Sequence, residues 1–543
     1  MPAPIKPTAN KIKLYLIKPA YKDFMKILKD PAAAALRSTV LPGIGTLYYK
    51  QSFPQTPEWL KDFFENHPAL HLGDFKVSST SAVLLVEQKI KTDSRIFALT
   101  FGGGRHLLHE FATEGRFGLI TTLNIVEPAG LRSMIKTTLS ANPKISAEQV
   151  SRASDTKDFQ INIEQDIVES ITGSNTHPDF GKIISGKDAL SVTGKITAKT
   201  LSPFLKKIFL LYSKKDYRTN FKWIDQIQEI KDSKLIDQLN SILLDGINKV
   251  IDIPLWMAVP EIIDWSDFNG FKYSNRKTDD LHEDLDLEVY ISAKGGKPIS
   301  YDDLKHDIVS CWRESKDNSV LQWSVFKCLN SELTHGIDLY FLDKGKWYKL
   351  ERSFVKEVKK VVAEIKIYPK VLPDFKHKDE GDYNLALATS LKALLLDARN
   401  VPYGGGASKI EVCDILTPQQ EFFHIKKYGG SSTLSHLFAQ GFVSGELFAS
   451  DSIFREKVKK HLSVGPPYNA FFSKDRPAIH QYKVIYGVIT ASKKGISIPF
   501  FSQVTLKNYK RILEGYGYTL YLAEIKNINP PSKPPKKKKA VKP

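Results

Sequence analysis

The spacing of apolar residues changes several times along this chain, and each change restricts the secondary structure that a segment can form. Residues 11–17 (KIKLYLI) alternate in the manner of a strand and precede a helical stretch over 21–29, so the chain opens in β-α order. Apolar residues fall at helical spacing from 203 to 247, and strand patterns return between about 285 and 350. Mixed patterns of this kind predict a multidomain α+β protein.

The length of 543 residues is several times the usual size of one hydrophobic core, so several domains are expected. We predict an N-terminal α+β domain over residues 1–200 and a middle domain over 201–368, in which helices precede a β-hairpin. A C-terminal α/β domain should follow over 369–528. Residues 529–543 form a Pro/Lys tail that is predicted to be disordered, because it has too few apolar residues to build a core.

Two local signals support the later part of this division. The turn sequence Asp343, Lys344 and Gly345 lies between two strand patterns and predicts a tight β-hairpin. Pro369 and Pro373, together with a cluster of charged residues, then interrupt the pattern and mark a boundary between domains.

The composition argues against several classes of protein. No window approaches the roughly 20 apolar residues that span a bilayer, and the first residues carry lysines without a cleavage-site pattern. The three cysteines, Cys311, Cys328 and Cys413, form no C-x-x-C pair, so a disulfide framework or a structural zinc site is not expected. We therefore expect a cytoplasmic protein that does not bind membranes.

The net charge of +18 favours a polyanionic partner. The tail contributes six lysines and no acid, and subtracting them leaves +12 for the rest of the chain. Positive charge raises the rate of encounter with nucleic acid and supplies affinity through counterion release. A basic surface that only keeps the protein in solution is the alternative explanation of the same charge.

The C-terminal third contains the cluster of residue types that most suggests chemistry. A helical run over 385–394 follows a short acidic segment, and strands are predicted over 394–401, 410–416 and 421–428. The order is therefore helix, strand, strand, strand. Acidic, imidazole and amino side chains are placed along it at Glu380, Asp382, Asp397, Glu411, Asp414, His424 and Lys426.

Residues two apart on a strand share a face, so His424 and Lys426 should project together, and a hairpin would bring Asp414 beside them. A carboxylate on one strand and an x-Lys pair on the next is the layout of the PD-(D/E)XK nucleases, which this segment resembles. The resemblance implies a restriction-endonuclease-like domain in which acids hold a divalent metal. It also implies that Lys426 positions or activates the attacking water.

The sequence departs from that layout where the superfamily has an acid two residues before the lysine and this chain has His424. Mg²⁺ prefers oxygen ligands, whereas Mn²⁺ accepts imidazole more readily. We predict Asp414, His424 and Glu411 as ligands of Mg²⁺ or Mn²⁺, with His424 as an alternative proton carrier. Glu411 lies three residues from Asp414 and would need a bulge to reach the same face.

Other acids remain open as the group that completes this site, and four further residues are candidates for binding substrate. The acids are Glu411, Asp397, Glu380 and Asp382, of which Glu380 and Glu411 are the predicted supporting catalytic residues. Ser431 and Ser432 begin a helix whose backbone N–H groups suit a phosphate, and Gln440 lies further along it. Arg105 follows a glycine run between a strand and a helix.

Segments spread over nearly the whole chain are similar to a sporadically distributed bacterial protein family of unknown function, which is found in mobile elements and defence-associated regions. The resemblance implies a setting in which invading nucleic acid is attacked or sensed. The segments are 101–105 (FGGGR), 117–119 (FGL) with 123–124 (LN), 185–188 (SGKD), 346–348 (KWY), Glu380 with Tyr383 and Asn384, 411–416 (EVCDIL), 424–426 (HIK), 435–441 (SHLFAQG) and 499–502 (PFFS).

Together these observations predict a metal-dependent nuclease that cuts DNA or RNA in defence against phage or mobile elements. The rival hypothesis is a non-catalytic protein that binds nucleic acid or senses phage on an endonuclease-like scaffold. A toxin that transfers a group to a host protein has no motif here and ranks last. The sequence leaves open whether the chain forms a homo-oligomer.

Overall fold

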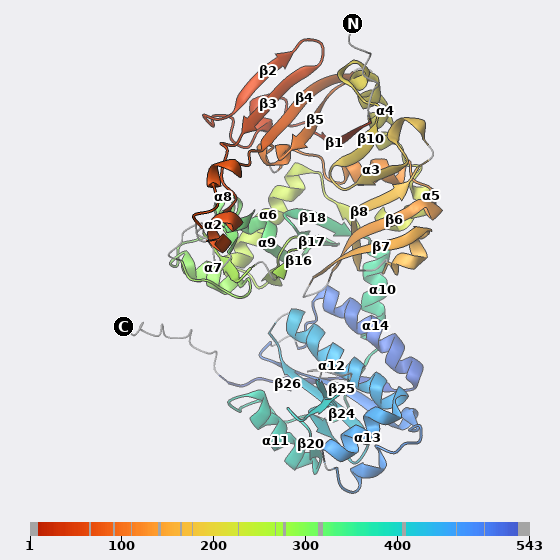
Figure 1. Cartoon of the computed structure of the whole chain (residues 1–543). Coiled ribbons are helices and arrows are strands. Elements are labelled where there is room, and N and C mark those ends of the chain that lie inside the picture. Colours follow the sequence, from red (N-terminus) through yellow and green to blue (C-terminus); the bar gives the residue numbers. More distant parts are fainter. Residues whose placement is uncertain are drawn as a thin grey trace. The chain divides into compact units, whose positions relative to one another are not determined.

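The computed structural model in Figure 1 describes most of the chain as a mixed α/β protein with several sheets. Among the described helices, none is both long and apolar enough to cross a bilayer. Of the predicted tail over 529–543, residues 530–543 lie outside the described residues. The description covers residues 9–529 without 65–66, 91–92, 110, 140–142, 163–164, 176, 226, 266–267, 275–278, 313–318, 404–408, 430, 463 and 493–494.

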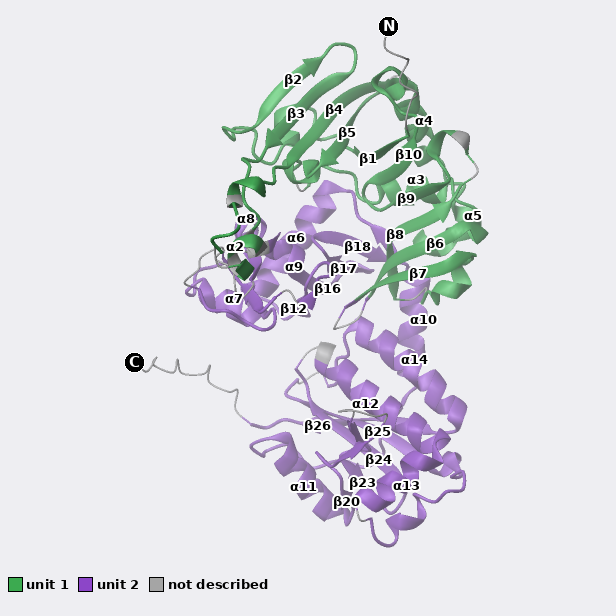
Figure 2. Cartoon of the chain, viewed as in Figure 1, with its two compact units in different colours: residues 1–138, 145–226 green, residues 139–144, 227–543 purple. Residues whose placement is uncertain are grey.

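The chain divides into two compact units, which Figure 2 colours separately. The first comprises residues 1–138 and 145–226, and the second comprises 139–144 and 227–543. The first unit therefore continues past the predicted boundary at residue 200. It does so because Leu201, Leu205 and Ile208 of one helix are buried in the N-terminal core.

The first unit is built on a ten-stranded sheet with the order β2-β3-β4-β5-β1-β10-β9-β8-β6-β7. Its strands are β1 (Asn10–Leu16), β2 (Arg37–Leu41), β3 (Gly45–Gln51), β4 (Thr80–Ile90), β5 (Asp93–Gly102), β6 (Leu131–Thr138), β7 (Lys144–Ser154), β8 (Asp166–Ser174), β9 (Ile183–Gly186) and β10 (Leu190–Gly194). Its helices are α1 (Phe24–Ile27), α2 (Glu58–Phe64), α3 (Phe117–Leu123), α4 (Leu201–Ser213) and α5 (Arg218–Phe221).

Helix α3 packs directly on this sheet because it carries a glycine at the point of contact. A Cβ atom on Gly118 would lie 1.9 Å from the Ala189 carbonyl oxygen, so no larger residue fits there. Phe117, Leu119 and Leu123 of the same helix are buried in the core cluster.

The second unit begins with a five-stranded sheet in the order β11-β18-β17-β16-β12 and a three-stranded sheet β13-β14-β15. The strands are β11 (Ile227–Glu229), β12 (Leu255–Met257), β13 (Gly270–Lys272), β14 (Ile308–Trp312), β15 (Ser319–Ser324), β16 (Leu329–His335), β17 (Asp338–Asp343) and β18 (Lys346–Leu350). The helices are α6 (Ser233–Ile247), α7 (Leu287–Ala293), α8 (Tyr301–His306), α9 (Val325–Cys328) and α10 (Arg352–Ala363).

The predicted hairpin is confirmed in this sheet. Strands β17 and β18 pair in antiparallel register from Tyr340 with Lys349 to Asp343 with Lys346. The two residues of the turn, Lys344 and Gly345, have φ angles of 52° and 72°, as a tight two-residue hairpin requires.

The remaining part of the second unit is a six-stranded sheet with the order β19-β26-β25-β24-β23-β20. Strands β19, β26, β25 and β24 run parallel, and β23 pairs antiparallel with both of its neighbours, β24 and β20. The strands are β19 (Lys366–Ile367), β20 (Leu394–Leu395), β23 (Ile415–Leu416), β24 (Glu421–Lys427), β25 (Lys483–Thr490) and β26 (Thr519–Lys526), with a separate hairpin of β21 (Asn400–Pro402) and β22 (Lys409–Glu411). The helices are α11 (Glu380–Leu391), α12 (Ser431–Ser450), α13 (Ser452–His461) and α14 (Phe500–Tyr516).

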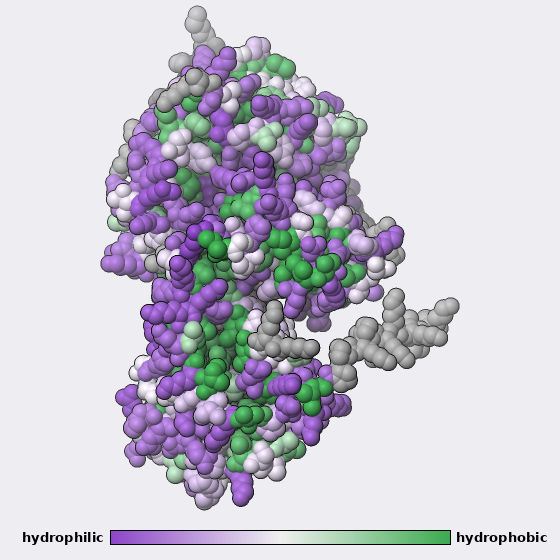
Figure 3. Space-filling view, turned by 180° about the vertical axis from the view of Figure 1, so that it is seen from behind, coloured by the Kyte–Doolittle hydropathy of each residue, from purple (hydrophilic) through white to green (hydrophobic). Residues whose placement is uncertain are grey.

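Helices cover both faces of this sheet, and two apolar clusters fill the layers between. On one face, Leu387 of α11 packs with Phe423 and Ile425 of β24. On the other face, residues of α12, α13 and α14 pack with Phe422 and Val484. The alternation of β24 therefore sends neighbouring side chains into opposite layers. Figure 3 shows one outer face of the molecule, where hydrophilic residues predominate and apolar residues form patches between them.

A buried carboxylate joins the five-stranded sheet to helix α14. Glu332 of β16 is 4% exposed, and its carboxylate accepts the backbone N–H groups of Phe500 at 2.6 Å and Phe501 at 3.2 Å. These are orphan donors at the start of a helix whose preceding residue, Pro499, supplies no side-chain cap. Burial raises the pKa of the Glu332 carboxyl from 4.5 to about 7.

Replacing Glu332 with Gln should change how stability depends on pH. The folded protein holds this proton more tightly than the unfolded chain, so the group stabilises the fold at low pH. That contribution is lost as the pH rises from about 4.5 to about 7. The free energy of unfolding of the wild type relative to Glu332→Gln should therefore fall by about 1.4 kcal/mol per pH unit between about pH 5 and 6.5. Denaturant titrations measure this, and parallel pH profiles would contradict it.

Candidate metal centre

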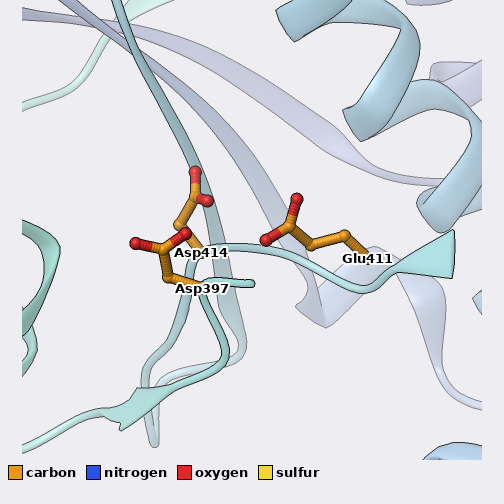
Figure 4. A group of neighbouring side chains, drawn as sticks. All are labelled: Asp397, Glu411 and Asp414. Atoms are coloured by element: carbon orange, nitrogen blue, oxygen red, sulfur yellow. The ribbon is translucent and has the colours of Figure 1, made fainter. Parts of the chain in front are cut away.

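Three acidic side chains from separate stretches of the chain meet at one end of the six-stranded sheet. Asp397 follows β20, Glu411 ends β22, and Asp414 immediately precedes β23. One carboxylate oxygen from each lies within 4.8 Å of the others. Figure 4 shows the three carboxylates gathered around a common space. The structure thus selects Asp397 and Glu411 as the acids that accompany Asp414, and Glu380 and Asp382 are not members of this group.

The acids meet because two predicted strands are broken. The predicted strand over 394–401 divides into β20 and β21, with a turn in which Ala398 adopts a φ of +57°. The predicted strand over 410–416 divides into β22 and β23, and residues 412–414 are not in a strand. Strict alternation therefore does not apply between Glu411 and Asp414, and the three-residue spacing does not separate their side chains.

Hydrogen bonds orient each carboxylate. Glu411 accepts the backbone N–H of Ala398 at 2.7 Å and the Nε2 group of Gln440 at 3.0 Å, one on each oxygen. Asp397 accepts Nδ2 of Asn384 at 3.0 Å. Asp414 accepts the backbone N–H of Ile425 in β24. Helices α11 and α12 and strand β24 therefore all help to hold the three acids in place.

The electrostatics of the group are unfavourable for three negative charges alone. Burial, assisted by the charges of Glu411 and Asp397, raises the pKa of Asp414 to about 8. Burial and the Asp397 charge also raise the pKa of Glu411, although the Ala398 N–H and Lys426 act in the opposite direction. A bound cation would relieve this repulsion and favour the ionised carboxylates.

Lys426 lies near these acids, but its ion pair is with Glu380. The Lys426 Nζ atom is 2.8 Å from Oε2 of Glu380, and the other oxygen of Glu380 accepts the backbone N–H of Lys427 at 2.9 Å. Burial lowers the pKa of Lys426, but Glu380, Asp414 and Glu411 outweigh it and the net effect is a raised pKa. Lys426 is therefore an ammonium ion, and Glu380 orients it.

The structure does not bring His424 into the group of acids. His424 is 3% exposed, its ring is 6.1 Å from the ring of Tyr486, and it lies beside Val412 and Phe422 beneath α12. Burial lowers its pKa to about 3, so the imidazole is neutral. His424 and Lys426 lie two residues apart on the uninterrupted strand β24 and so leave the same face of the sheet, as expected. The buried imidazole of His424 nevertheless takes no part in the acid group, whereas Lys426, near the end of the strand, reaches Glu380 of α11.

The four residues that were predicted to bind substrate lie in different parts of the structure. Gln440 donates to Glu411 and so supports an acid of the group. Ser431 and Ser432 begin α12, but their side chains lie outside the described residues. Arg105 belongs to the first unit, where its guanidinium lies over the ring of Tyr15 and donates to the Leu108 carbonyl.

Sequence reasoning missed one residue beside the acids. His436 lies four residues before Gln440 on α12, so both project from the same side of the helix. Its charge lowers the pKa of Glu411, which places the imidazole within electrostatic reach of that carboxylate. The four-residue spacing from Gln440 is the signal that could have identified it.

A comparison with models of protein families assigns nearly the whole chain to one family. A family model described as a family of unknown function, DUF6119, matches residues 12–526. The chain belongs to the DUF6119 family. No curated protein and no solved structure shows a significant match to it. The match spans nearly the whole chain, in agreement with the resemblance to a family of unknown function. Because the function of the family is unknown, the acid group of this DUF6119 protein has to be interpreted from its chemistry.

The donor set of the DUF6119 protein suits a hard divalent cation. All three side chains offer carboxylate oxygens, which Mg²⁺ and Mn²⁺ prefer, and none offers sulfur or nitrogen. The Oδ1 atom of Asn384 is buried without a hydrogen-bond partner in the described part of the chain, and the same amide binds Asp397. The residues present therefore fit a cation bound by oxygen atoms.

Proposed function

We propose that this protein is a divalent-metal-dependent nuclease, a hydrolase of phosphodiester bonds in DNA or RNA. The observation that carries the proposal is the convergence of Asp397, Glu411 and Asp414 near the ammonium group of Lys426. Three oriented carboxylates and a lysine form the set of groups that metal-assisted hydrolysis of a phosphodiester requires.

The order of elements around the acids supports a restriction-endonuclease-like domain. Helix α11 is followed by β20, β23 and β24, and then by α12, with only the small β21–β22 hairpin inserted. Asp414 immediately precedes β23, and Lys426 lies on the neighbouring β24. This arrangement supports the resemblance to the carboxylate and x-Lys layout of the PD-(D/E)XK nucleases.

Each residue then has a distinct role. Asp397, Glu411 and Asp414 would hold Mg²⁺ or Mn²⁺, which, when bound, lowers the pKa of water and neutralises charge on the phosphate. The ammonium of Lys426 stabilises the negative charge that develops on the phosphate oxygens. Glu380 positions Lys426, and Gln440 positions Glu411. His424 packs in the core and has no part in this scheme.

The rival function is non-catalytic binding of nucleic acid on the same scaffold. Binding alone does not require three carboxylates to meet near Lys426. The separation of at most 4.8 Å between the three ligand atoms favours the enzyme.

The proposal is tested by incubating the purified full-length chain with plasmid, linear DNA and RNA in Mg²⁺, in Mn²⁺ and in EDTA. We expect cleavage of at least one substrate with a metal and none in EDTA. Cleavage that is equal in EDTA would identify a contaminant or a metal-independent reaction. Absence of cleavage of all three substrates with either metal would favour the binding protein.

We further propose that the cleavage acts against phage or mobile elements. The support is the similarity to a family found in defence-associated regions, together with a basic chain suited to nucleic acid. Cells expressing the wild-type protein should resist infection by at least one phage from a panel, and cells expressing Asp414→Asn should not. Equal protection by both proteins would separate defence from cleavage.

A further inference from the structure

The small β21–β22 hairpin lies between two acids of the candidate metal centre, and one of its faces is buried. The hairpin follows Asp397, and its second strand ends at Glu411. Val401 pairs with Ile410, and both pack in the apolar cluster to which α12 and α13 also contribute. Successive residues of a strand point to opposite faces, so the residues on either side of this pair leave the outer face.

This outer face carries a lysine on the same side as an acid of the metal centre. Asn400 pairs with Glu411, and Pro402 pairs with Lys409. Asn400, Pro402 and Lys409 are exposed. Lys409 and Glu411 are two residues apart on β22, so about 7 Å of strand separates them and their side chains leave the same face. A ligand bound at the acids can therefore extend over Lys409.

Contacts with α13 hold the hairpin in place beside the acids. The Arg399 guanidinium donates at 2.8 Å to the carbonyl of Leu462, the residue that caps the end of α13. The Tyr403 hydroxyl donates to the carboxylate of Asp451, the residue that caps the start of this helix. These contacts fix β21, and the pairing of β21 with β22 fixes the backbone of Lys409.

Lys409 is free to bind a negatively charged ligand. In the part of the chain that the structure describes, its ammonium forms no ion pair or hydrogen bond, whereas the Lys426 ammonium is paired with Glu380. Of the described hairpin residues, 398–403 and 409–411, only Glu411 is acidic, and it belongs to the metal group. The outer face thus presents one available positive charge next to a centre that would hold a divalent cation. Charge of this sign complements a row of phosphates.

We propose that the outer face of the β21–β22 hairpin, with Lys409 as its principal contact, binds a phosphate next to the one that the metal centre would cleave. The inference rests on the proposed nuclease function, and the ligand is the backbone of a DNA or RNA strand. Neighbouring phosphates of a strand are separated by a length comparable to the step from Glu411 to Lys409. A lysine recognises the charge of a phosphate rather than the identity of a base, so this contact is independent of sequence. Because the contact is the same in the bound substrate and in the transition state, it lowers KM and leaves kcat unchanged.

The test changes the charge of the outer face without altering the acids. Lys409→Gln removes the ammonium, and Lys409→Arg keeps a positive group at the same position. Pro402→Glu places a negative charge beside an intact Lys409, and Pro402→Gln is its neutral counterpart. Lys457→Gln is the matched control, because Lys457 is also exposed near the hairpin but lies over the Tyr403 ring, 5.2 Å from its centre, on the side of α13.

Each full-length protein is assayed for binding and for cleavage. Binding to short fluorescent DNA and RNA duplexes is measured in Ca²⁺, which oxygen ligands also hold, and the duplexes are checked to be intact afterwards. KM and kcat are measured for cleavage in Mn²⁺. The binding measurement does not depend on whether the protein cleaves.

We expect Lys409→Gln and Pro402→Glu to raise Kd and KM by about tenfold at low salt, with kcat unchanged. In Lys409→Gln, the slope of log Kd against log salt should weaken by about 0.9 on duplex DNA, because one phosphate is no longer neutralised. Lys409→Arg, Pro402→Gln and Lys457→Gln should each stay within about twofold of the wild type in both constants.

An equal rise of Kd and KM in Lys457→Gln would overturn the inference, because net charge alone would then explain the effect. A wild-type Kd in Lys409→Gln would do the same. If the wild type binds the duplexes but does not cleave, the proposed function falls, and Kd alone still decides whether Lys409 contacts a phosphate. If the wild type binds neither duplex, the inference falls with it.

Discussion

Asp414→Asn should reduce metal-dependent cleavage to below about one hundredth of the wild-type rate. Asp414 is half-buried, as are Asp397 and Glu411, and its backbone carbonyl also accepts the N–H groups of Leu396 and Asp397, so it lies at the centre of the arrangement. An amide supplies no negative charge to a cation. Single-turnover cleavage in saturating Mn²⁺ measures the loss.

The same variant should fold normally, which separates a missing ligand from a damaged fold. Because the pKa of Asp414 is raised to about 8, the carboxyl of the metal-free protein is mostly protonated at neutral pH, and Asn resembles that form in shape and charge. The change in stability should stay within about 1 kcal/mol. Mn²⁺ should raise the Tm of the wild type but not that of Asp414→Asn.

Asp382→Asn is the matched control, because Asp382 is an exposed acid of α11 that lies outside the acid group. It should keep its cleavage and its response to Mn²⁺. Full cleavage by Asp414→Asn, or an equal loss in Asp382→Asn, would remove Asp414 from the proposed site.

Lys426→Ala should lower the rate of the chemical step by about a hundredfold or more, because its ammonium stabilises charge that appears only in the transition state. Metal binding should survive, since the three carboxylates remain. Lys426 is 34% exposed and its partner Glu380 is 29% exposed, so removing the ion pair should change stability by less than about 1 kcal/mol. Single-turnover rates and the shift of Tm in Mn²⁺ measure the two effects separately.

Lys483→Ala provides a matched control on the neighbouring strand. Lys483 of β25 is 36% exposed and forms an ion pair of 3.1 Å with Glu421, which is 3% exposed. Its removal leaves a buried carboxylate with one partner fewer, so it should cost at least as much stability as Lys426→Ala. Cleavage should nevertheless remain close to that of the wild type. A loss of cleavage that simply follows stability in both variants would show that Lys426 is structural.

Local patterns determined much of the C-terminal domain. The sequence predicted the order of helix and strands, the opposite orientations of neighbouring side chains on β24, and the candidate pair of Asp414 and Glu411. It also predicted the turn of the β17–β18 hairpin. These features follow from the chemistry of neighbouring residues, because alternation and turn preferences act over a few positions.

Breaks within strands were not predictable in this way. The segments over 394–401 and 410–416 read as continuous strands, yet each is interrupted, and the interruption brings Asp397 and Glu411 to Asp414. The left-handed turn occurs at Ala398, a residue that carries no turn signal. Its backbone N–H donates to Glu411, which lies in a different strand, so a contact outside the turn helps to select this conformation.

The sequence by itself determined that His424 and Lys426 alternate with apolar neighbours, and it identified the acids from which a metal centre could be built. Only the tertiary structure decided that α12 covers His424, that Glu380 of α11 holds Lys426, and that Asp397 completes the acid group. The physical reason is that the periodicity of a strand fixes how its side chains point relative to one another. It does not fix which helix covers each face of the sheet. That choice depends on apolar surface contributed by residues far along the chain.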